Sequence, residues 1–409
     1  MKRYFLYFLL PLMFLASCKK NEITVPPSAE DSNLTNTQPI GFNIMKTMEG
    51  IYMLTTGSNA LGDNFVCKVS KKKVSFFSNK DGIFIILKYG LKSTDGSIQF
   101  SGFWRYSERK DQGNIQFTIT AANGATDLLN GIINHLTLTG ANAGNDMRLQ
   151  YTRPFSADAI SRGFMIMAHH GVLTTSDPPY AENSLLSVLN DEDYGVTGLE
   201  FDVRMTKDHV PICIHDPSIN TRLTMKGPLS GGWDQYSFDL ISSYIRLVDG
   251  QKVPSVEQAL NAFIDSTNLS YFWMDVKGNV DVFKYLEPVV RKANARAAAI
   301  NRKVVIFAGL PSEEVINEFH KQPSYADLPT LCEQSLQLAL DNKSKYFGPR
   351  FSEGILLDDV AKAHANGIKV ISWTLNDKGL IKNYLQNGEF DGFITDYPAY
   401  VVYDYYTMF

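Results

Sequence analysis

The sequence predicts two domains of different fold class, a small all-β antiparallel domain followed by an α/β barrel of the TIM type. From residue 41 to 154, short alternating apolar runs are broken by Gly, Asn, Asp and Lys, as in a β-meander. From residue 163 to 409, short apolar runs alternate with longer runs of helical periodicity, which is typical of an α/β fold.

Residues 1–18 have the features of a lipoprotein signal peptide. Lys2 and Arg3 precede an apolar run over residues 4–14 that is too short to span a bilayer. The sequence Leu-Ala-Ser-Cys ending at Cys18 then resembles the bacterial lipobox, which implies lipidation of Cys18. An ordinary signal peptide with an incidental cysteine is the alternative. We expect an exported bacterial lipoprotein of the cell envelope, held at the outer membrane and facing the periplasm or the surface. The polar residues 19–40 predict a flexible tether.

Composition excludes some partners. The net charge of -4 and the lack of a long basic run argue against nucleic-acid binding. The remaining cysteines, Cys67, Cys213 and Cys332, are far apart and odd in number, so they indicate buried thiols rather than a disulfide framework.

The first domain contains strand-like runs whose spacing predicts an antiparallel meander that closes into a small sandwich or barrel. The runs resemble a lipocalin-like barrel. Its aromatic residues, Phe103, Trp104 and Tyr106 among them, either line a cavity for an unknown ligand or fill the core, and we favour the core. The runs cover residues 51–54, 65–69, 74–77, 83–89, 98–106, 115–120, 135–138 and 147–152.

Residues 155–163 form a connector, and the second domain follows. About eight strand-like runs over about 250 residues fit a TIM-type barrel. A doubly wound sheet is the alternative, but no GxGxxG turn follows the first strand. Strands are expected at 164–168, 198–203, 210–214, 271–276, 304–308, 354–356, 369–373 and 392–395, and helices at 255–265, 280–300, 313–320, 328–341, 358–366 and 378–386.

Two carboxylates lie in one predicted strand. Glu200 and Asp202 alternate with apolar residues, so both side chains leave the same face. Two acids on an inner face repel each other unless a cation lies between them. Oxygen ligands favour Ca²⁺ or Mg²⁺. The alternative is that one of the two acids points outward and is solvated.

Two histidines end predicted strands. His169 follows the first strand of the second domain, and His215 ends the run 210–214. Imidazole titrates near neutral pH, so such a pair can act as general acid and base, although a lone histidine is more often structural. A two-residue turn at Asp208-His209 would place His215 opposite Asp202.

Asp275 and Lys277 lie one residue apart in a further strand, 271–276 and its end. A carboxylate and an ammonium group on one inner face can complete a metal site and contact phosphate oxygens. An internal ion pair is the alternative.

The ordered motifs AHHG, AEN, EFDVRMTKD, VPICIHD, VPSVEQAL, MDVK, ISWTLN and GFITDYP closely resemble the glycerophosphodiester phosphodiesterase family, over about residues 164–398. The resemblance implies a TIM barrel that hydrolyses small glycerophosphodiesters to glycerol phosphate and an alcohol. It implies one divalent cation, general acid–base catalysis by two histidines, and a lysine and a tryptophan beside the substrate. The residues are His169 and His215 for catalysis, Glu200, Asp202 and Asp275 for the cation, and Lys277 and Trp373 for the substrate. Glu182 is a weaker candidate nearby, and we expect Asp396 to cap the final turn.

The chain departs from the family pattern at three places. His170 stands where the family has an arginine, and an imidazole cannot reproduce the bidentate contact of a guanidinium with phosphate. We keep His170 as a candidate phosphate contact. Asp275 stands for a glutamate, and Ala181 for a proline. Two other functions therefore stay open, phospholipase-like cleavage of a lipid head group and non-catalytic binding of a lipid or sugar.

Overall fold

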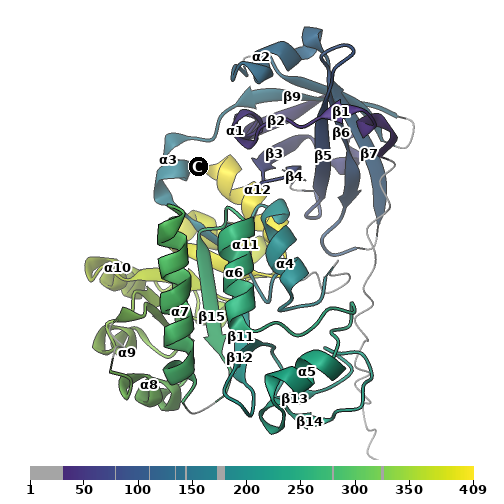
Figure 1. Ribbon diagram of the computed structural model, residues 1–409. Coiled ribbons are helices and arrows are strands. Elements are labelled where there is room, and N and C mark those ends of the chain that lie inside the picture. Colours follow the sequence, from purple (N-terminus) through teal and green to yellow (C-terminus); the bar gives the residue numbers. More distant parts are fainter. Residues whose placement is uncertain are drawn as a thin grey trace, which may run out of the picture.

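The computed structural model describes residues 31–409 except 79, 110, 134, 143–144, 173–179, 279–280 and 324–326. The β-domain lies above the α/β domain in Figure 1, with helix α12 (Pro398–Met408) between them. The expected signal peptide, Cys18 and residues 19–30 of the expected tether lie outside the described residues.

The first domain is a closed antiparallel barrel. Each strand pairs with the next along the chain, and β2 closes the ring on β9. The eight expected runs all correspond to strands. Because the sheet closes on itself, the domain is a barrel rather than a sandwich. The strands are β2 (Gly50–Thr56), β3 (Asn64–Val69), β4 (Val74–Ser78), β5 (Phe84–Lys92), β6 (Ile98–Arg105), β7 (Gln112–Ile119), β8 (Thr137–Asn142) and β9 (Asn145–Arg153).

The chain joins this barrel before residue 41. Strand β1 (Thr37–Gln38) pairs with β5, and Nδ2 of Asn33 donates to the carbonyl of Phe100 at 2.9 Å. The end of the expected tether over 19–40 was therefore placed too late, because strand pairing and burial of Ile40 fix the residues just before it. The short helices α1 (Phe42–Lys46) and α2 (Ala125–Leu129) complete the described part of the domain.

Alternation along the strands divides the side chains of the β-domain between two cores. Phe65 and Cys67 face the barrel interior, whereas Val66 between them packs into the core shared with the α/β domain. Tyr106 belongs to the interior cluster, Trp104 packs against its edge, and Phe103 packs on the shared core. The barrel interior is thus packed with apolar side chains, as we favoured for these aromatics.

The second domain is an eight-stranded parallel barrel with a helix after each strand, which confirms the TIM-type fold. The strands are β10 (Met165–Ala168), β11 (Gly198–Met205), β15 (Tyr271–Val276), β16 (Val305–Leu310), β17 (Thr330–Cys332), β18 (Tyr346–Phe347), β19 (Lys369–Ser372) and β20 (Gly392–Thr395). The helices are α4 (Leu185–Asn190), α6 (Val256–Ser266), α7 (Val282–Ala299), α8 (Glu313–His320), α9 (Leu336–Asp341), α10 (Leu357–Ala365), α11 (Lys378–Asn387) and α12.

One strand assignment and one helix assignment were wrong. Residues 354–356 form no strand, because Gly354 ends a 3₁₀ turn and Leu356 caps α10. The run 328–341 is not one helix, since β17 occupies its first part and Ser335 then caps α9. Strand β18 was not expected, because two residues carry no periodicity. The helices α3 (Ala157–Arg162) and α5 (Phe238–Tyr244) were also not expected.

Strand β12 (Pro211–Cys213) is antiparallel to β11 and lies outside the ring. The expected register was wrong by one residue, because the turn has three residues rather than two and His209 adopts a left-handed conformation with φ 61°. The amide of Ile214 donates to the carbonyl of Asp202, so Ile214, not His215, lies opposite Asp202. Beyond β12, the segment with β13 (Ser218–Ile219), β14 (Gly231–Gly232) and α5 has a small apolar core around Trp233.

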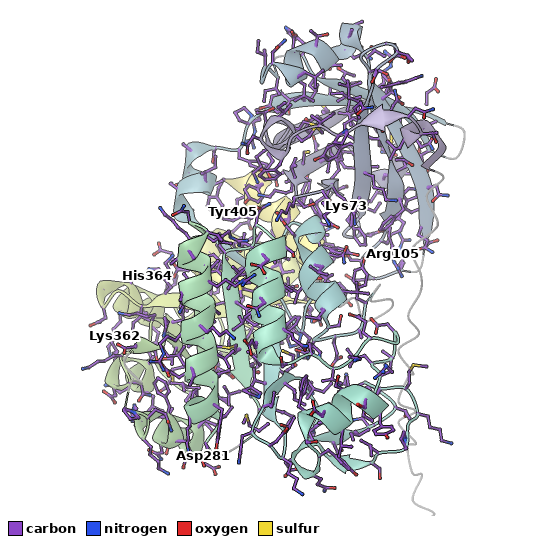
Figure 2. The ribbon with its side chains drawn as sticks, viewed as in Figure 1. Lys73, Arg105, Asp281, Lys362, His364 and Tyr405 are labelled. Atoms are coloured by element: carbon purple, nitrogen blue, oxygen red, sulfur yellow. The ribbon has the colours of Figure 1, made fainter. Side chains whose placement is uncertain are left out.

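The β-domain covers the end of the α/β barrel at which the strands begin. The arrowhead of β15 in Figure 1 points away from the β-domain. Lys73, labelled in Figure 2 at the junction, pairs with Asp193 at 2.6 Å, and Ser70 donates to the same carboxylate at 2.5 Å. The opposite end, where the strands finish, carries the candidate catalytic residues.

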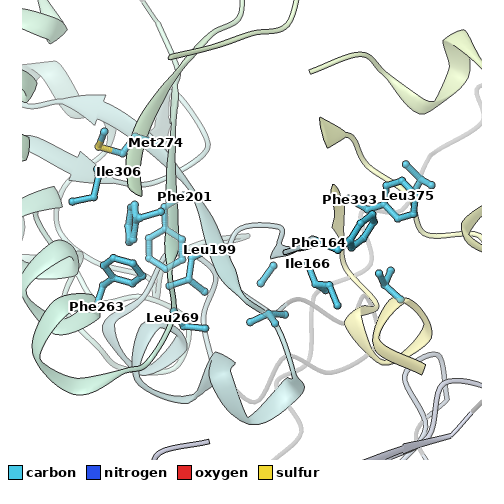
Figure 3. Packing of buried hydrophobic residues seen from close by; sticks show 14 of the residues in the cluster. Phe164, Ile166, Leu199, Phe201, Phe263, Leu269, Met274, Ile306, Leu375 and Phe393 are labelled. Atoms are coloured by element: carbon cyan, nitrogen blue, oxygen red, sulfur yellow. The ribbon is translucent and has the colours of Figure 1, made fainter. Parts of the chain in front are cut away.

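The core of the α/β domain lies between strands and helices. Phe201 of β11 packs against Phe272 of β15, which packs against Phe263 of α6 (Figure 3). The remaining cysteines, Cys67, Cys213 and Cys332, are buried and free, as expected. Among the described residues, no helix has the length and apolar character needed to cross a membrane.

Candidate active site

Three carboxylates meet inside the barrel mouth. Glu200 and Asp202 leave the inner face of β11, and Asp275 lies beside Asp202 on β15 in the parallel register. All three are at least nine-tenths buried, and one oxygen of each lies within 4.8 Å of an oxygen of the other two. The alternative that one acid points outward is wrong, because both acids of β11 are buried.

The donor set fits a hard divalent cation. Among the described residues, Oε1 of Glu200 and Oδ1 of Asp275 are buried without a hydrogen-bond donor. Burial, followed by the charges of Asp202 and Asp275, raises the pKa of Glu200 well above its ordinary range. Three crowded oxygens with unused acceptor capacity are what a Ca²⁺ or Mg²⁺ ion would neutralise.

The loop from β10 to α4 orients two of these acids. The amide of His170 donates to Oε2 of Glu200 at 2.8 Å. Nδ2 of Asn183 donates to Oδ2 of Asp202 at 2.7 Å, and its Oδ1 accepts the Asp202 amide at 2.8 Å. His170 and Asn183 adopt left-handed backbone conformations, with φ 55° and 56°. Each acid therefore uses one oxygen for orientation and keeps the other for a ligand.

Lys277 continues the inner face of β15. Its ammonium group pairs with Asp275 and lies 3.4 Å from Oδ1 of Asp202. Burial alone would lower the pKa of Lys277, but the charges of Asp275, Asp202 and Glu200 outweigh it and raise the pKa. The lysine is thus a fixed positive charge that forms an internal ion pair with Asp275, and its contact with phosphate stays a prediction.

His169 lies at the end of β10 and is oriented by Asp396. Its Nδ1 is 2.7 Å from Oδ1 of Asp396, and Oδ2 of that carboxylate accepts Nδ2 of Asn376 at 2.6 Å. Burial would lower the pKa of His169, but the hydrogen bond and charge of Asp396 raise it above its ordinary value. The expected cap was wrong: Tyr397 occupies the N-cap of α12, which has no side-chain cap bond.

His215 has a carboxylate partner of its own. Its Nδ1 is 2.7 Å from Oδ1 of the adjacent Asp216. Arg222 donates to both oxygens of Asp216, from Nη2 at 2.7 Å and from Nε at 3.0 Å. Burial would raise the pKa of Asp216, but the hydrogen bonds from Arg222, His215 and Asn220 lower it strongly. Both histidines therefore have Nδ1 occupied, which leaves Nε2 for chemistry.

Glu182 is tied to this second histidine through the same arginine. Arg222 contacts both its oxygens, at 2.8 and 3.1 Å, in a bidentate pair. Glu182 is 7% exposed, and burial raises its pKa although Arg222 opposes the shift. Glu182 thus orients Arg222, in keeping with its weaker candidacy for a direct role.

His170 lies between the two histidines rather than at the surface. Its ring centroid is 3.8 Å from that of His169 and 5.0 Å from that of His215, and its Nε2 is 3.4 Å from Oδ2 of Asp202. Burial, followed by the charges of His169 and His215, keeps the pKa of His170 well below its ordinary value. An imidazole whose pKa is lowered in this way therefore lies between the rings of His169 and His215. Its contact with phosphate stays a prediction.

Trp373 ends β19, where an apolar wall was expected. Its Nε1 donates to the carbonyl of Gly348 at 2.6 Å, and the guanidinium of Arg350 lies 4.9 Å from its ring centroid. Trp373 packs on the cluster that fills the barrel interior, which includes Trp273 and Phe307. It therefore packs on the core, and its role as a wall beside the substrate stays a prediction.

Sequence reasoning missed several residues of the site. Asp216 lies in the motif VPICIHD and Asn376 in ISWTLN. Their position as polar residues close to candidate site residues was the signal that could have identified them. Arg204 donates to the carbonyls of His215 and Lys277 at 2.6 and 3.3 Å. The alternation of Glu200, Asp202 and Arg204 along one strand was the signal that could have identified it. Arg222, Glu333 and Arg350 had no such signal, because loops of unrelated sequence bring them to the mouth.

The fold and these contacts define a class of protein: a (β/α)₈-barrel hydrolase whose barrel mouth gathers histidines and carboxylates. Residues 174–322 match the sequence model of the Glycerophosphoryl diester phosphodiesterase family. The barrel of this chain is therefore similar to that family. The matched span includes Glu200, Asp202, His215, Asp275 and Lys277, while His169 precedes it and Trp373 follows it.

Curated relatives align with the barrel region. A Bacillus altitudinis glycerophosphodiester phosphodiesterase is 24% identical over 246 residues, which are 57% of this chain and 94% of that protein. A protein of Bacillus subtilis named YqiK, without an assigned function, is 25% identical over 238 residues, 57% of this chain and 95% of its own length. The rat glycerophosphodiester phosphodiesterase 1 is 23% identical over 269 residues, 56% of this chain and 77% of its own.

Solved structures are similar over the same region. A glycerophosphodiester phosphodiesterase from Parabacteroides distasonis has a TM-score of 0.49 and 19% identity, covering 60% of this chain and 97% of that one. A phosphodiesterase from Oleispira antarctica, solved with sn-glycerol-3-phosphate, has a TM-score of 0.46 and 17% identity, covering 60% and 98%.

Proposed function

We propose that this protein hydrolyses glycerophosphodiesters to glycerol phosphate and an alcohol, with a divalent cation, Ca²⁺ or Mg²⁺, held by Glu200, Asp202 and Asp275. The observation that carries the proposal is the pair of histidines, each fixed through Nδ1 by its own carboxylate, beside the three buried acids. The match of the barrel to the family model and the names of its curated relatives support the same substrate class.

The residues of the chain divide the work between charge and proton transfer. When bound, the cation would neutralise the phosphate and polarise its bonds. Lys277 holds a positive charge at the same place and contacts the phosphate oxygens. Nε2 of one histidine accepts a proton from the nucleophile, which is water or the glycerol hydroxyl, and Nε2 of the other protonates the leaving alkoxide.

Asp396 and Asp216 hold both rings in the required tautomer, because each accepts the Nδ1 proton. Buried His170, kept neutral by its surroundings, separates the two rings. The site therefore combines two Nε2 atoms on fixed rings, one fixed ammonium group and three acids at the barrel mouth.

The test uses the purified protein with a glycerophosphodiester and an assay for released glycerol phosphate. We expect turnover that a chelator abolishes and that Ca²⁺ or Mg²⁺ restores. His169→Ala and His215→Ala should each abolish turnover while circular dichroism and Tm stay near those of the unchanged protein. Near wild-type hydrolysis by either variant would refute the assignment.

The same assay separates the other two functions. Cleavage of phosphatidylinositol or sphingomyelin in place of glycerophosphodiesters would favour a phospholipase-like enzyme. Ligand binding without turnover of any diester would favour a non-catalytic binding protein.

We also propose that Cys18 is lipidated and holds the enzyme at the bacterial cell envelope. The lipobox-like residues before it and the positive charges at Lys2 and Arg3 support this proposal. Membrane fractions of cells that express the full chain should contain the protein and incorporate labelled fatty acid into it, and Cys18→Ser should abolish both. Labelling that survives this substitution would overturn the proposal.

A further inference from the structure

One wall of the barrel mouth carries polar groups that the proposed reaction does not use. Glu333 follows β17, Arg350 follows β18, and Trp373 follows β19. In the ring of eight strands, β17 and β18 lie across from β10 and β11, which carry His169 and the acids. This wall therefore faces the acids of β11 across the barrel mouth.

Arg350 is held in place without a carboxylate partner. Its guanidinium stacks on the face of Trp373, at 4.9 Å from the ring centroid, and the Trp373 indole is fixed by its bond to Gly348. Among the described residues, no acidic oxygen pairs with the guanidinium within 4.0 Å, whereas Arg222 is shared by two carboxylates. Arg350 is thus a positioned cation with free donors at the mouth.

Glu333 supplies an acceptor below this cation. Its Oε1 is buried and has no donor in the described part of the chain. The absence of a side chain at Gly309 leaves a notch there, since a Cβ would lie 3.1 Å from Oε1 of Glu333 and 2.7 Å from Nε1 of Trp273. Nε1 of Trp273 is a second buried polar atom without a partner. Buried polar groups of this kind are usually satisfied, so they point to a bound polar molecule.

The charge of Glu333 interacts with the cation site and with Arg350. After burial, the charge of Asp275 raises the pKa of Glu333, and Lys277 and Arg350 lower it. Glu333 therefore lies within electrostatic reach of the cation site on one side and of Arg350 on the other.

We propose that Glu333 and Arg350 form a subsite that selects the alcohol part of the diester, and that this alcohol carries a hydrogen-bond donor and an anionic group. The inference rests on the proposed function. Glu333 accepts a hydrogen bond from an ammonium or hydroxyl group, and Arg350 pairs with a carboxylate further out. A zwitterionic, amino-acid-like alcohol such as serine satisfies both groups at once.

The experiment compares two probes that differ by one carboxylate, glycerophosphoserine and glycerophosphoethanolamine. With the unchanged full chain and its cation, we expect kcat/KM to favour the serine diester by about five- to tenfold, as for a partly exposed ion pair. Arg350→Gln should bring this ratio to about one, and Arg350→Lys, which keeps the charge, should retain part of it. Arg291→Gln, at an exposed arginine on α7, is the matched control and should leave the ratio unchanged.

The backbone of Arg350 makes a contact that its substitution does not remove, so the variants test the side chain. Its amide donates to Oε1 of Glu353 at 3.0 Å, a bond that does not depend on the side chain. A wild-type protein that hydrolyses both diesters without preference, or a preference that survives Arg350→Gln, would overturn the subsite while the proposed function stands. Hydrolysis of neither diester would overturn the proposed function and the subsite together.

Discussion

Nδ1 of His169 lies 2.7 Å from Oδ1 of Asp396, although 227 residues separate the two in the chain. The contact exists because β10 and β20 are neighbours in the closed ring and finish at the same end. Asn376, from the segment after β19, accepts the Asp396 amide at 2.8 Å and also donates to its carboxylate. Closure of the barrel therefore brings His169 to the carboxylate that orients its ring and raises its pKa.

Replacing this carboxylate tests its role directly. Asp396→Asn keeps the size of the side chain but removes the charge, so we expect kcat to fall on the order of 10³-fold through loss of the correct tautomer. Because Asp396 raises the pKa of His169, its loss should move the limb of the kcat/KM profile that belongs to His169 to lower pH. The measurement is the pH–rate profile. An unshifted profile would mean that Asp396 is only structural.

Substitution of Glu200 should weaken cation binding but stabilise the cation-free protein. Glu200→Gln removes one ligand, so calorimetry should show at least about tenfold weaker binding of Ca²⁺ or Mg²⁺. The same change relieves repulsion with Asp202 and Asp275, so the cation-free variant should unfold at a higher temperature than the cation-free wild type. The cation should raise the Tm of the wild type more than that of the variant. Equal affinity in both proteins would argue against Glu200 as a ligand.

Arg222 should contribute to stability through its ion pair with Glu182 and to turnover through its contact with Asp216. Arg222→Met leaves Glu182 buried without its ion pair, and we expect the free energy of unfolding to fall by about 1–3 kcal/mol. The double variant Arg222→Met, Glu182→Met should recover most of that loss, because no unpaired charge then remains buried. Its turnover should stay low, since Asp216 is still without the arginine that fixes it. Denaturant unfolding and kcat on the three variants provide the check.

Asp191 should make stability depend on pH. Burial raises its pKa from 3.8 to about 8, although bonds from Ser187 and the Val172 amide oppose the shift. The folded state then binds the proton more tightly than the unfolded state. The stability from this proton is fully present below pH 3.8 and is lost as pH rises through about 8.

Asp191→Asn removes this titration. The difference in unfolding free energy between variant and wild type should therefore change in favour of the variant by up to about 1.4 kcal/mol per pH unit between pH 4 and 8. Urea titrations at several pH values measure it. A difference that does not vary with pH would show that Asp191 does not titrate in this range.

Strands with clear alternation were predictable, and short strands were not. The eight strands that form the ring of the β-domain, β2 to β9, were expected, because one face of each is apolar over several residues, whereas the two-residue β1 was not. Strands β17 and β18 have three and two residues, too few to show a period, and were missed or merged into a helix. The register of β12 was wrong because the turn length is set by a left-handed His209, which no neighbouring glycine announced.

The residues that carry charge at the site were found from the sequence, and the residues that orient them were not. Glu200, Asp202 and Asp275 follow from strand alternation, and His169 and His215 from their place at strand ends. Asp396 was assigned to a cap, and its contact with His169 needs the ring to close. The same holds for Arg222, which reaches Glu182 from a segment 40 residues away.

By itself, the sequence determined the fold class of both domains, the chemical types at the centre of the site and the resemblance of the barrel to one family, because these depend on local periodicity and on motifs in order. Only the tertiary structure decided which carboxylate holds each histidine, that His170 is buried between them, and that Glu333 and Arg350 share a wall of the mouth. These contacts join residues far apart in the chain. They are set by strand order and closure, which local periodicity does not encode.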